Sequence, residues 1–182
     1  FWNSDLWIDK IEYFLEFLKL HNSESSTISG SKLLYPFESL HEGHSTNILK
    51  HFPQRTDGSY KGTVQFGGSR WFPSMIKTKA GNLNISLPYH FRRFSDKNDS
   101  RVNSNYGTDF VTGALQLVDL EWFINVGGFN PSLPKVFQDV DLCLKAVKEN
   151  KTVMYFGKDI HFFHDESYNH YSNKNQEKMD LQ

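Results

Sequence analysis

Apolar and polar positions alternate with helical spacing near the start of the chain. Between residues 7 and 21, apolar side chains recur at Trp7, at Ile11, at Phe14 or Leu15, and at Leu18, with charged side chains between them. This spacing places the apolar side chains on one stripe of a helix and leaves the charged ones in water. The pattern therefore predicts an amphipathic helix over residues 7–21.

A strand is predicted next, over residues 27–35, where apolar residues return until Pro36 closes the segment. Regular spacing then disappears between residues 37 and 105, where Gly, Ser, Asn, His and scattered aromatic residues are mixed. Irregular segments of that length inside a compact domain commonly carry function or mobility. A helix followed by a strand is typical of the α/β class, so we expect an α/β protein with a long irregular middle region.

Regular patterns return after residue 109. Residues 110–118 are largely apolar and predict a strand buried on both faces. Asp119 is placed to cap a short helix over residues 120–126, and Gly127 or Gly128 can end that helix in the left-handed conformation. The order of these signals again indicates an α/β arrangement.

The last regular segments are a helix over residues 139–149 and strands over residues 152–156 and 159–164. We expect residues 1–168 to form one domain and the polar residues 169–182 to form a tail without regular structure.

Composition limits the size and the partners of this domain. The 182 residues are 38% apolar, which suffices for one hydrophobic core. The 20 Lys and Arg nearly balance the 21 Asp and Glu, so no broad positive field would attract nucleic acid. No apolar run approaches the roughly 20 residues that cross a bilayer, so no transmembrane segment is expected. The single cysteine, Cys143, excludes an internal disulfide.

Acidic residues and a histidine gather in the last third of the chain. Asp139 and Asp141 stand at the start of a predicted helix, and His164 follows a predicted strand. Carboxylates and imidazole together can hold a divalent cation and accept a proton from a hydroxyl group. Carboxylates at a helix N-terminus also stabilise the helix by capping it, so both roles stay open at this point.

Four motifs in a fixed order give this part of the chain a family resemblance. TGALQLV begins at Thr112, GGF at Gly127, QDVDLCLK at Gln138 and HFFHDES at His161. Their order and spacing resemble those of the motifs in the C-terminal half of family 2 glycosyltransferases, which have the GT-A fold. FWNSD, residues 1–5, is similar to the end of the strand that carries the metal-binding D-x-D variant of that family.

The resemblance implies a metal site. In the family the last Asp of this variant, matched here by Asp5 at the C-terminal end of a parallel strand, holds Mn²⁺ or Mg²⁺ on the donor diphosphate. Asn3 stands where the first Asp is usual and is implied to contact the donor nucleotide. His164 matches the histidine that completes the metal shell. Without the resemblance, Asp5 could simply cap the helix that follows, and His164 could be an ordinary interior histidine.

The resemblance also implies a catalytic base. Asp139 matches the carboxylate that deprotonates the acceptor hydroxyl, and Gln138 stands where Glu is usual, which removes a charge beside the base. The acceptor side of the family falls on five positions: Thr112, Gly113, Gly128, Gln138 and Asp141. Tight strand packing at Gly113 and a helix end at Gly128 are the alternatives.

Two features of the irregular region stay ambiguous. His41 and Gly43 are similar to the H-x-G turn of the family, to which we assign a structural role. The aromatic residues there, among them Trp71, Tyr89 and His90, could stack on sugars or fill a second small core.

The resemblance thus implies a metal-dependent, inverting glycosyltransferase of cell-surface polysaccharide biosynthesis, in the cytoplasm or at the inner face of the membrane. It would move a sugar from a nucleotide-sugar donor to a glycan or lipid-linked acceptor. The expected fold is a GT-A-like mixed sheet flanked by helices, without the N-terminal nucleotide-binding half of the family. We therefore expect this segment to be inactive alone and to pair with a second copy through an exposed sheet edge. The alternatives are a non-catalytic module that binds glycans or proteins and a metal-dependent hydrolase.

Overall fold

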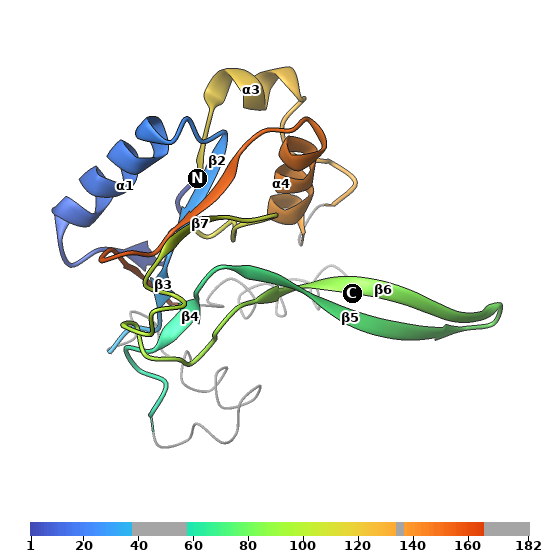
Figure 1. The fold of residues 1–182 in the computed structure, drawn as a ribbon, viewed down its shortest axis with the longest axis horizontal. Coiled ribbons are helices and arrows are strands. Elements are labelled where there is room, and N and C mark those ends of the chain that lie inside the picture. Colours follow the sequence, from blue (N-terminus) through green and yellow to red (C-terminus); the bar gives the residue numbers. More distant parts are fainter. Residues whose placement is uncertain (38–57, 134–136, 166–182) are drawn as a thin grey trace, which may run out of the picture.

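The computed structural model describes residues 1–37, 58–133 and 137–165, and these form a mixed α/β structure. Figure 1 shows strands in the centre, α1 and α4 on either side of them, and a long hairpin that projects from the body. The helices are α1 (Ile11–Ser23), α3 (Leu120–Asn125) and α4 (Gln138–Lys148).

Two parallel pairs of strands form the centre. β2 (Ile28–Ser31) pairs with β9 (Val153–Phe156), and β3 (Leu33–Leu34) pairs with β10 (Phe162–His164). The chain runs from β2 into β3 and from β9 into β10, so the same two segments supply both pairs. These strands are almost entirely buried, as expected for parallel strands that are covered on both faces.

Antiparallel strands flank each parallel pair and make both sheets mixed. One sheet has the order β1-β10-β3-β4 and the other β7-β9-β2-β8. The flanking strands are short: β1 (Leu6–Trp7), β4 (Val64–Phe66), β7 (Asn105–Gly107) and β8 (Leu117–Val118). Mixed sheets together with helices confirm the predicted α/β class.

The strand predicted over residues 27–35 is divided at Lys32, which separates β2 from β3. Lys32 is 2% exposed, and its ammonium donates to the carbonyl oxygen of Lys97 and to Oδ1 of Asn103, both at 2.9 Å. Burial lowers the pKa of Lys32 to about 8. The two hydrogen bonds therefore replace the water that this cation loses on folding.

The first helix is shorter than predicted and buries a different face. It begins at Ile11 because residues 6–7 pair with β10 as strand β1. Phe17 is fully buried and Phe14 packs against the core, whereas Ile11 and Leu15 are each 57% exposed. The apolar residues of this helix cover too much of its circumference for spacing alone to select the buried stripe.

The next two helices agree with the sequence pattern. Asp119 caps α3, since its Oδ1 accepts from the backbone N–H of Trp122 at 2.8 Å. Gly127 and Gly128 both adopt positive φ, at 79° and 68°, after the helix ends. The buried face of α4 consists of Val140, Leu142, Cys143 and Ala146.

The strand predicted over residues 110–118 is wrong for most of its length, because only its end forms β8. A turn at Gly113 and Ala114 interrupts it, where the N–H of Gly113 donates to Oδ2 of Asp139 at 2.7 Å. The carbonyl of Ala114 then accepts from the N–H of Asn3 at 3.0 Å. This segment therefore connects the start of the chain to the start of α4.

The irregular structure predicted for residues 37–105 is wrong for residues 64–90. Besides β4, this part forms β5 (Ser69–Thr78) and β6 (Gly81–His90), a long antiparallel hairpin with a tight turn. Residues 38–57, which include His41 and Gly43, lie outside the described residues.

Candidate functional site

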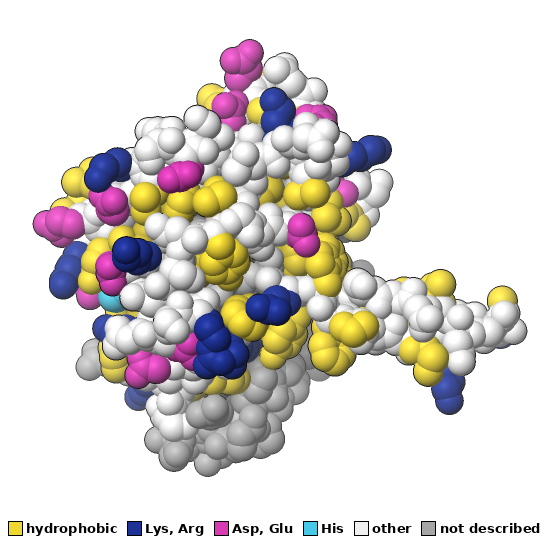
Figure 2. All heavy atoms as spheres, viewed as in Figure 1, with side chains coloured by type: hydrophobic (Ala, Val, Ile, Leu, Met, Phe, Trp, Pro, Cys, Tyr) yellow, Lys and Arg dark blue, Asp and Glu magenta, His cyan; other side chains and the backbone are white. Residues whose placement is uncertain are grey.

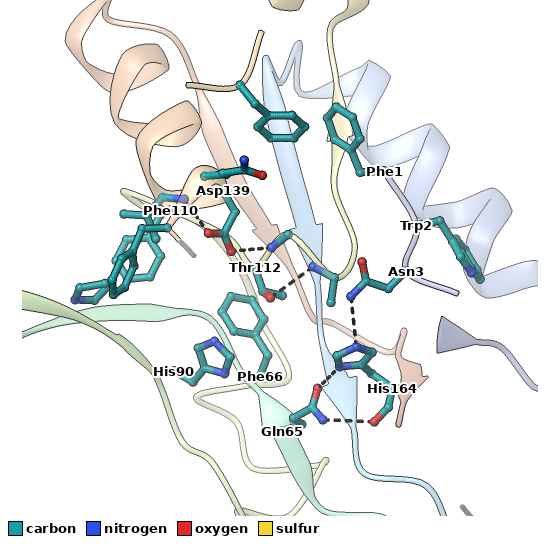
Figure 3. A pocket seen from close by; sticks show the side chains of 17 residues that line it. Phe1, Trp2, Asn3, Gln65, Phe66, His90, Phe110, Thr112, Asp139 and His164 are labelled. Carbon is teal, nitrogen blue, oxygen red and sulfur yellow. Dashed lines mark hydrogen bonds between the residues drawn. The ribbon is translucent and has the colours of Figure 1, made fainter. Parts of the chain in front are cut away.

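A cleft of about 710 Å³ lies where the start of the chain, β4, the base of β6, the end of β10 and the start of α4 meet. Figure 3 shows Asp139 and His164 on different sides of the cleft, with Thr112 between them. Six of the residues predicted for the site line it: Asn3, Thr112, Gly113, Gln138, Asp139 and His164. The fold thus brings Asn3 and His164 together although 161 positions separate them in the chain.

Asp5 and His164 form a buried pair beside this cleft. Oδ1 of Asp5 lies 3.2 Å from Nε2 of His164, and the two residues are 4% and 8% exposed. Burial raises the pKa of Asp5, but the neighbouring imidazole in its protonated form outweighs burial and holds the pKa below its ordinary value. Asp5 is therefore a carboxylate at neutral pH although it is buried.

The strand arrangement around Asp5 differs from the prediction. Asp5 does not end a parallel strand; it directly precedes β1, which runs antiparallel to β10 and pairs Leu6 with His164. The backbone N–H of Asp165 donates to the carbonyl oxygen of Asp5 at 2.9 Å. The antiparallel pairing of β1 with β10 therefore places Asp5 beside His164.

Gln65 on β4 fixes the other side of the His164 ring. Its Nε2 donates to the carbonyl oxygen of His164 at 3.1 Å, so its Oε1 accepts from Nδ1–H of the ring at 2.6 Å. In the neutral imidazole, a proton on Nδ1 leaves a lone pair on Nε2. That nitrogen faces Asp5 Oδ1 and lies 3.4 Å from Nδ2 of Asn3. Gln65 therefore leaves Nε2 able to bind a cation.

The atoms of Asp5 and His164 fit two ligands of one divalent cation. Oδ1 of Asp5 is buried and has no hydrogen-bond partner among the described residues. Adjacent ligands of an octahedral ion with bonds of about 2.1 Å lie about 3 Å apart, close to the 3.2 Å between Oδ1 and Nε2. The described residues contain no group of three or more His, Cys, Asp or Glu side chains placed for one metal. The protein would thus supply two such ligands here, and a bound diphosphate or water would supply others.

Asp139 is held at the first turn of α4 by two backbone N–H groups. Gly113 donates to Oδ2 at 2.7 Å, and Val140 donates to Oδ1 at 2.9 Å. The N-cap position of α4 belongs to Phe137, so Asp139 does not cap this helix in the usual way. Each carboxylate oxygen can still accept a further hydrogen bond. The carboxylate therefore has a fixed orientation and can receive a donor from the cleft.

A side chain at position 113 would crowd this contact. A Cβ added to Gly113 would lie 3.0 Å from Cβ and 3.4 Å from Oδ2 of Asp139. Thr112 beside it is 9% exposed and lines the same cleft. Gly113 is therefore closely packed and also lines the cleft, and its contact with an acceptor stays a prediction.

The start of α4 is strained where it borders the cleft. Phe137 has φ 63°, a left-handed conformation that costs a non-glycine residue about 1–3 kcal/mol. Phe137 is 51% exposed and lines the cleft, as does the half-buried Gln138 that follows. Residues 134–136 lie outside the described residues.

Three predicted site residues lie outside the cleft lining: Asp5, which pairs with His164 beside it, and Gly128 and Asp141. The carbonyl oxygen of Gly128 accepts from Nζ of Lys145 at 3.0 Å, and Oδ2 of Asp141 lies 3.4 Å from the same ammonium. Both residues therefore connect the end of the α3 segment to α4.

Much of the cleft is lined by aromatic residues, which the sequence did not assign to the site. Phe66 lies on β4 next to Gln65, and the ring of His90 meets its edge at a centroid distance of 5.1 Å. Phe110 also lines the cleft, and Trp71 packs against it at 5.0 Å. Of the aromatic residues in the middle region, His90 thus joins the cleft, while Trp71 supports its wall.

The motif HDES is only partly described, since Glu166, Ser167 and the tail 169–182 lie outside the described residues.

Among the helices that the structure describes, none has the length and apolar character needed to span a bilayer.

No family model, curated protein or solved structure matches this chain. Functional conclusions therefore depend on the residues of the cleft.

Proposed function

We propose that the chain is the acceptor-side part of a metal-dependent, inverting glycosyltransferase with a GT-A-like fold, which acts in the cytoplasm or at the inner face of the membrane. The observation that supports this most is the opposition of two chemistries across one cleft. Asp139 lies on one side and His164 on the other, and Oδ1 of Asp5 lies 3.2 Å from Nε2 of His164. Inverting transfer needs a base at the acceptor and a positive charge at the leaving group, on opposite sides of the sugar.

Asp139 would act on the acceptor, a hydroxyl group of a glycan or of a lipid-linked sugar. It accepts the hydroxyl proton while the hydroxyl oxygen attacks the anomeric carbon of the donor. The new C–O bond forms as the bond to the diphosphate oxygen breaks, and that electron pair leaves with the nucleoside diphosphate. The N–H groups of Gly113 and Val140 hold the base in one orientation throughout.

Asp5 and His164 would hold Mn²⁺ or Mg²⁺, which supplies positive charge beside the leaving diphosphate when bound. The orphaned Oδ1 of Asp5 and the lone pair that Gln65 leaves on Nε2 support this assignment. Asn3, whose amide lies 3.4 Å from Nε2, would contact the donor nucleotide.

A metal titration tests this part of the proposal with a control built into the chain. Asp5→Asn and His164→Gln should each lower Mn²⁺ affinity at least tenfold, as measured by calorimetry or by the electron paramagnetic resonance of free Mn²⁺. Asp9 and His161 are a second Asp–His pair, 3.9 Å apart and outside the cleft lining. Asp9→Asn and His161→Gln should leave the affinity unchanged. Equal effects at both pairs would contradict the assignment.

The base is tested by turnover in a chain that includes a nucleotide-binding half. Asp139→Asn should lower sugar transfer by about 10²–10⁴-fold, the usual contribution of a general base, while donor binding persists. Unchanged transfer would remove Asp139 from this role.

A non-catalytic module that binds glycans or proteins is the second candidate. It is favoured by the double hydrogen bonding of Asp139, which gives this carboxylate a structural role of its own. In that case the wild-type chain and the Asp139→Asn variant would bind a glycan with similar affinities. Neither would release a nucleoside diphosphate from any donor.

A further inference from the structure

The β5–β6 hairpin projects from the body, and its outer half is exposed to solvent. Figures 1 and 2 show it as an arm that extends away from both sheets, with hydrophobic side chains along it. Every residue from 75 to 84 is exposed. A two-stranded ribbon with so little covering is marginally stable in water, so a partner surface would stabilise it.

The register divides the hairpin into two faces. One face packs on the body: Trp71 donates from Nε1 to Asp109 Oδ2 at 2.8 Å, and His90 contacts Phe66. The other face points away from these contacts and is mostly apolar. Its apolar side chains, all but one of them 42–60% exposed, are Phe72, Ile76, Leu83, Ile85, Leu87 and Tyr89.

The charge of the hairpin has a single sign. Residues 69–90 contain Arg70, Lys77 and Lys79 and no Asp or Glu. The whole chain carries −1, so the remaining residues carry −4 against +3 in the hairpin. Arg70 stacks over the Phe91 ring at 4.2 Å near the base, whereas Lys77 and Lys79 are exposed at the outer end. The arm therefore combines an apolar face with a positive end.

Both outer edges of the hairpin are poorly suited to pairing with another strand. Pro73 lies in β5 and Pro88 in β6, and each removes a backbone donor from the open edge of its strand. Strand addition by a second copy of the chain is thereby disfavoured. Nucleic acid would leave the aliphatic residues of the free face without a partner.

We propose that this hairpin docks on an anionic lipid surface, with its apolar face at the boundary of headgroups and acyl chains. Such a surface has an apolar interior beneath negatively charged headgroups. A cationic amphipathic element binds it both by burying apolar side chains and by electrostatic attraction to the headgroups. Lys79, in the turn at the end of the arm, contacts lipid phosphates, and Lys77, which the register places on the opposite face beside Asn82, adds positive charge near that end. The docking does not depend on the chemistry of the cleft.

Vesicle flotation of the full chain tests this surface. The chain should float with vesicles of phosphatidylcholine and phosphatidylglycerol but not with phosphatidylcholine alone, and added salt should weaken the binding. Lys77→Gln with Lys79→Gln should weaken it by about fivefold for each lysine. Ile76→Ser with Leu83→Ser should weaken it at least tenfold.

A matched charge control comes from the end of α4, where Lys148 and Lys151 are exposed. Lys148→Gln with Lys151→Gln should leave vesicle binding unchanged, and circular dichroism should show that all variants are folded. The proposal is overturned if the wild-type chain floats with neither vesicle or if both lysine pairs have equal effects. It is also overturned if Ile76→Ser with Leu83→Ser abolishes a dimer in solution while no vesicle binds.

Discussion

Each ring nitrogen of His164 has its own neighbour, and this determines what the residue can bind. Gln65 accepts the proton on Nδ1, and Nε2 faces Asp5 and Asn3. An outer neighbour that fixes a tautomer and a ring orientation strengthens a metal ligand. Gln65 is therefore as informative about the candidate metal site as the two ligands themselves.

Replacing Gln65 tests this directly. Gln65→Leu should lower Mn²⁺ affinity by about 10–100-fold, because the ring loses both its orientation and its fixed tautomer. Gln65→Glu keeps an acceptor for Nδ1–H and should restore most of the affinity. The ¹⁵N shifts of the His164 ring should show the proton on Nδ1 in wild type and a mixture of tautomers in Gln65→Leu.

The control for this experiment is Gln116, which is fully buried and donates to the carbonyl oxygen of Val111 at 3.1 Å. Gln116→Leu should destabilise the fold without changing the tautomer of His164. If both variants lose the same Mn²⁺ affinity, Gln65 acts through stability and not through the ring.

His161 gives the fold a dependence on pH. Burial lowers its pKa to about 4, against 6.5 in the unfolded chain, although Asp9 nearby opposes the shift. Between these values the unfolded chain binds more protons than the folded one, so the free energy of unfolding falls as pH falls from 6.5 to 4.

His161→Gln should flatten this part of the stability curve by roughly 1–2 kcal/mol, less than the full shift because the Asp9 side chain beside the ring is 46% exposed to water. Urea denaturation at several pH values in this window measures the slope. The same slope in wild type and variant would show that His161 does not titrate in this way.

Local sequence determined the helices better than the strands. The limits of α3 and α4 follow from Asp119, from paired glycines and from spacing, all of which act within a few residues. The strand predicted over residues 110–118 failed because Gly113 is held by Asp139, a contact across 26 positions. Residues distant in sequence thus overrode a local preference for extended structure.

The hairpin was predictable in part. Leu83, Ile85, Leu87 and Tyr89 alternate with polar residues or proline, which is the period of a strand with one apolar face. What the sequence could not show is that this face lies away from the body. The role of Gln65 could not be predicted from the sequence either, because its contact with His164 spans 99 positions.

The cap of α3 offers a test of one such local signal. Asp119→Ala should lower the free energy of unfolding by about 1 kcal/mol, because the N–H of Trp122 loses its acceptor. Glu121, exposed in the same turn, is the matched control, and Glu121→Ala should have an effect below about 0.5 kcal/mol. Urea midpoints compare the two. A larger effect at Glu121 would contradict the cap.

At the scale of the whole molecule, the body and the arm should be separable. Joining Ser74 to Ile85 through Asn-Gly would replace the exposed residues 75–84 with a tight turn. The thermal midpoint should change by no more than about 4 °C, since none of the removed residues belongs to a hydrophobic cluster of the described residues. Mn²⁺ affinity should also persist, because Pro88 and His90 still line the cleft. Loss of the folded state would show that the arm is part of the core.

The expected pairing of two copies through a sheet edge stays a prediction. The edge strands of the two four-stranded sheets have two or three residues each, which leaves few backbone groups for a second copy. Sedimentation at several concentrations would measure whether they suffice.

The pairing of Leu6 with His164 also determines when the candidate site can form. Such a contact closes almost the whole described chain into one loop, and contacts of this separation form late in folding. During synthesis, Asp5 leaves the ribosome long before its partner exists. A cation held by Asp5 and His164 would therefore bind only a chain that has already closed on itself, and its binding would report the completion of folding.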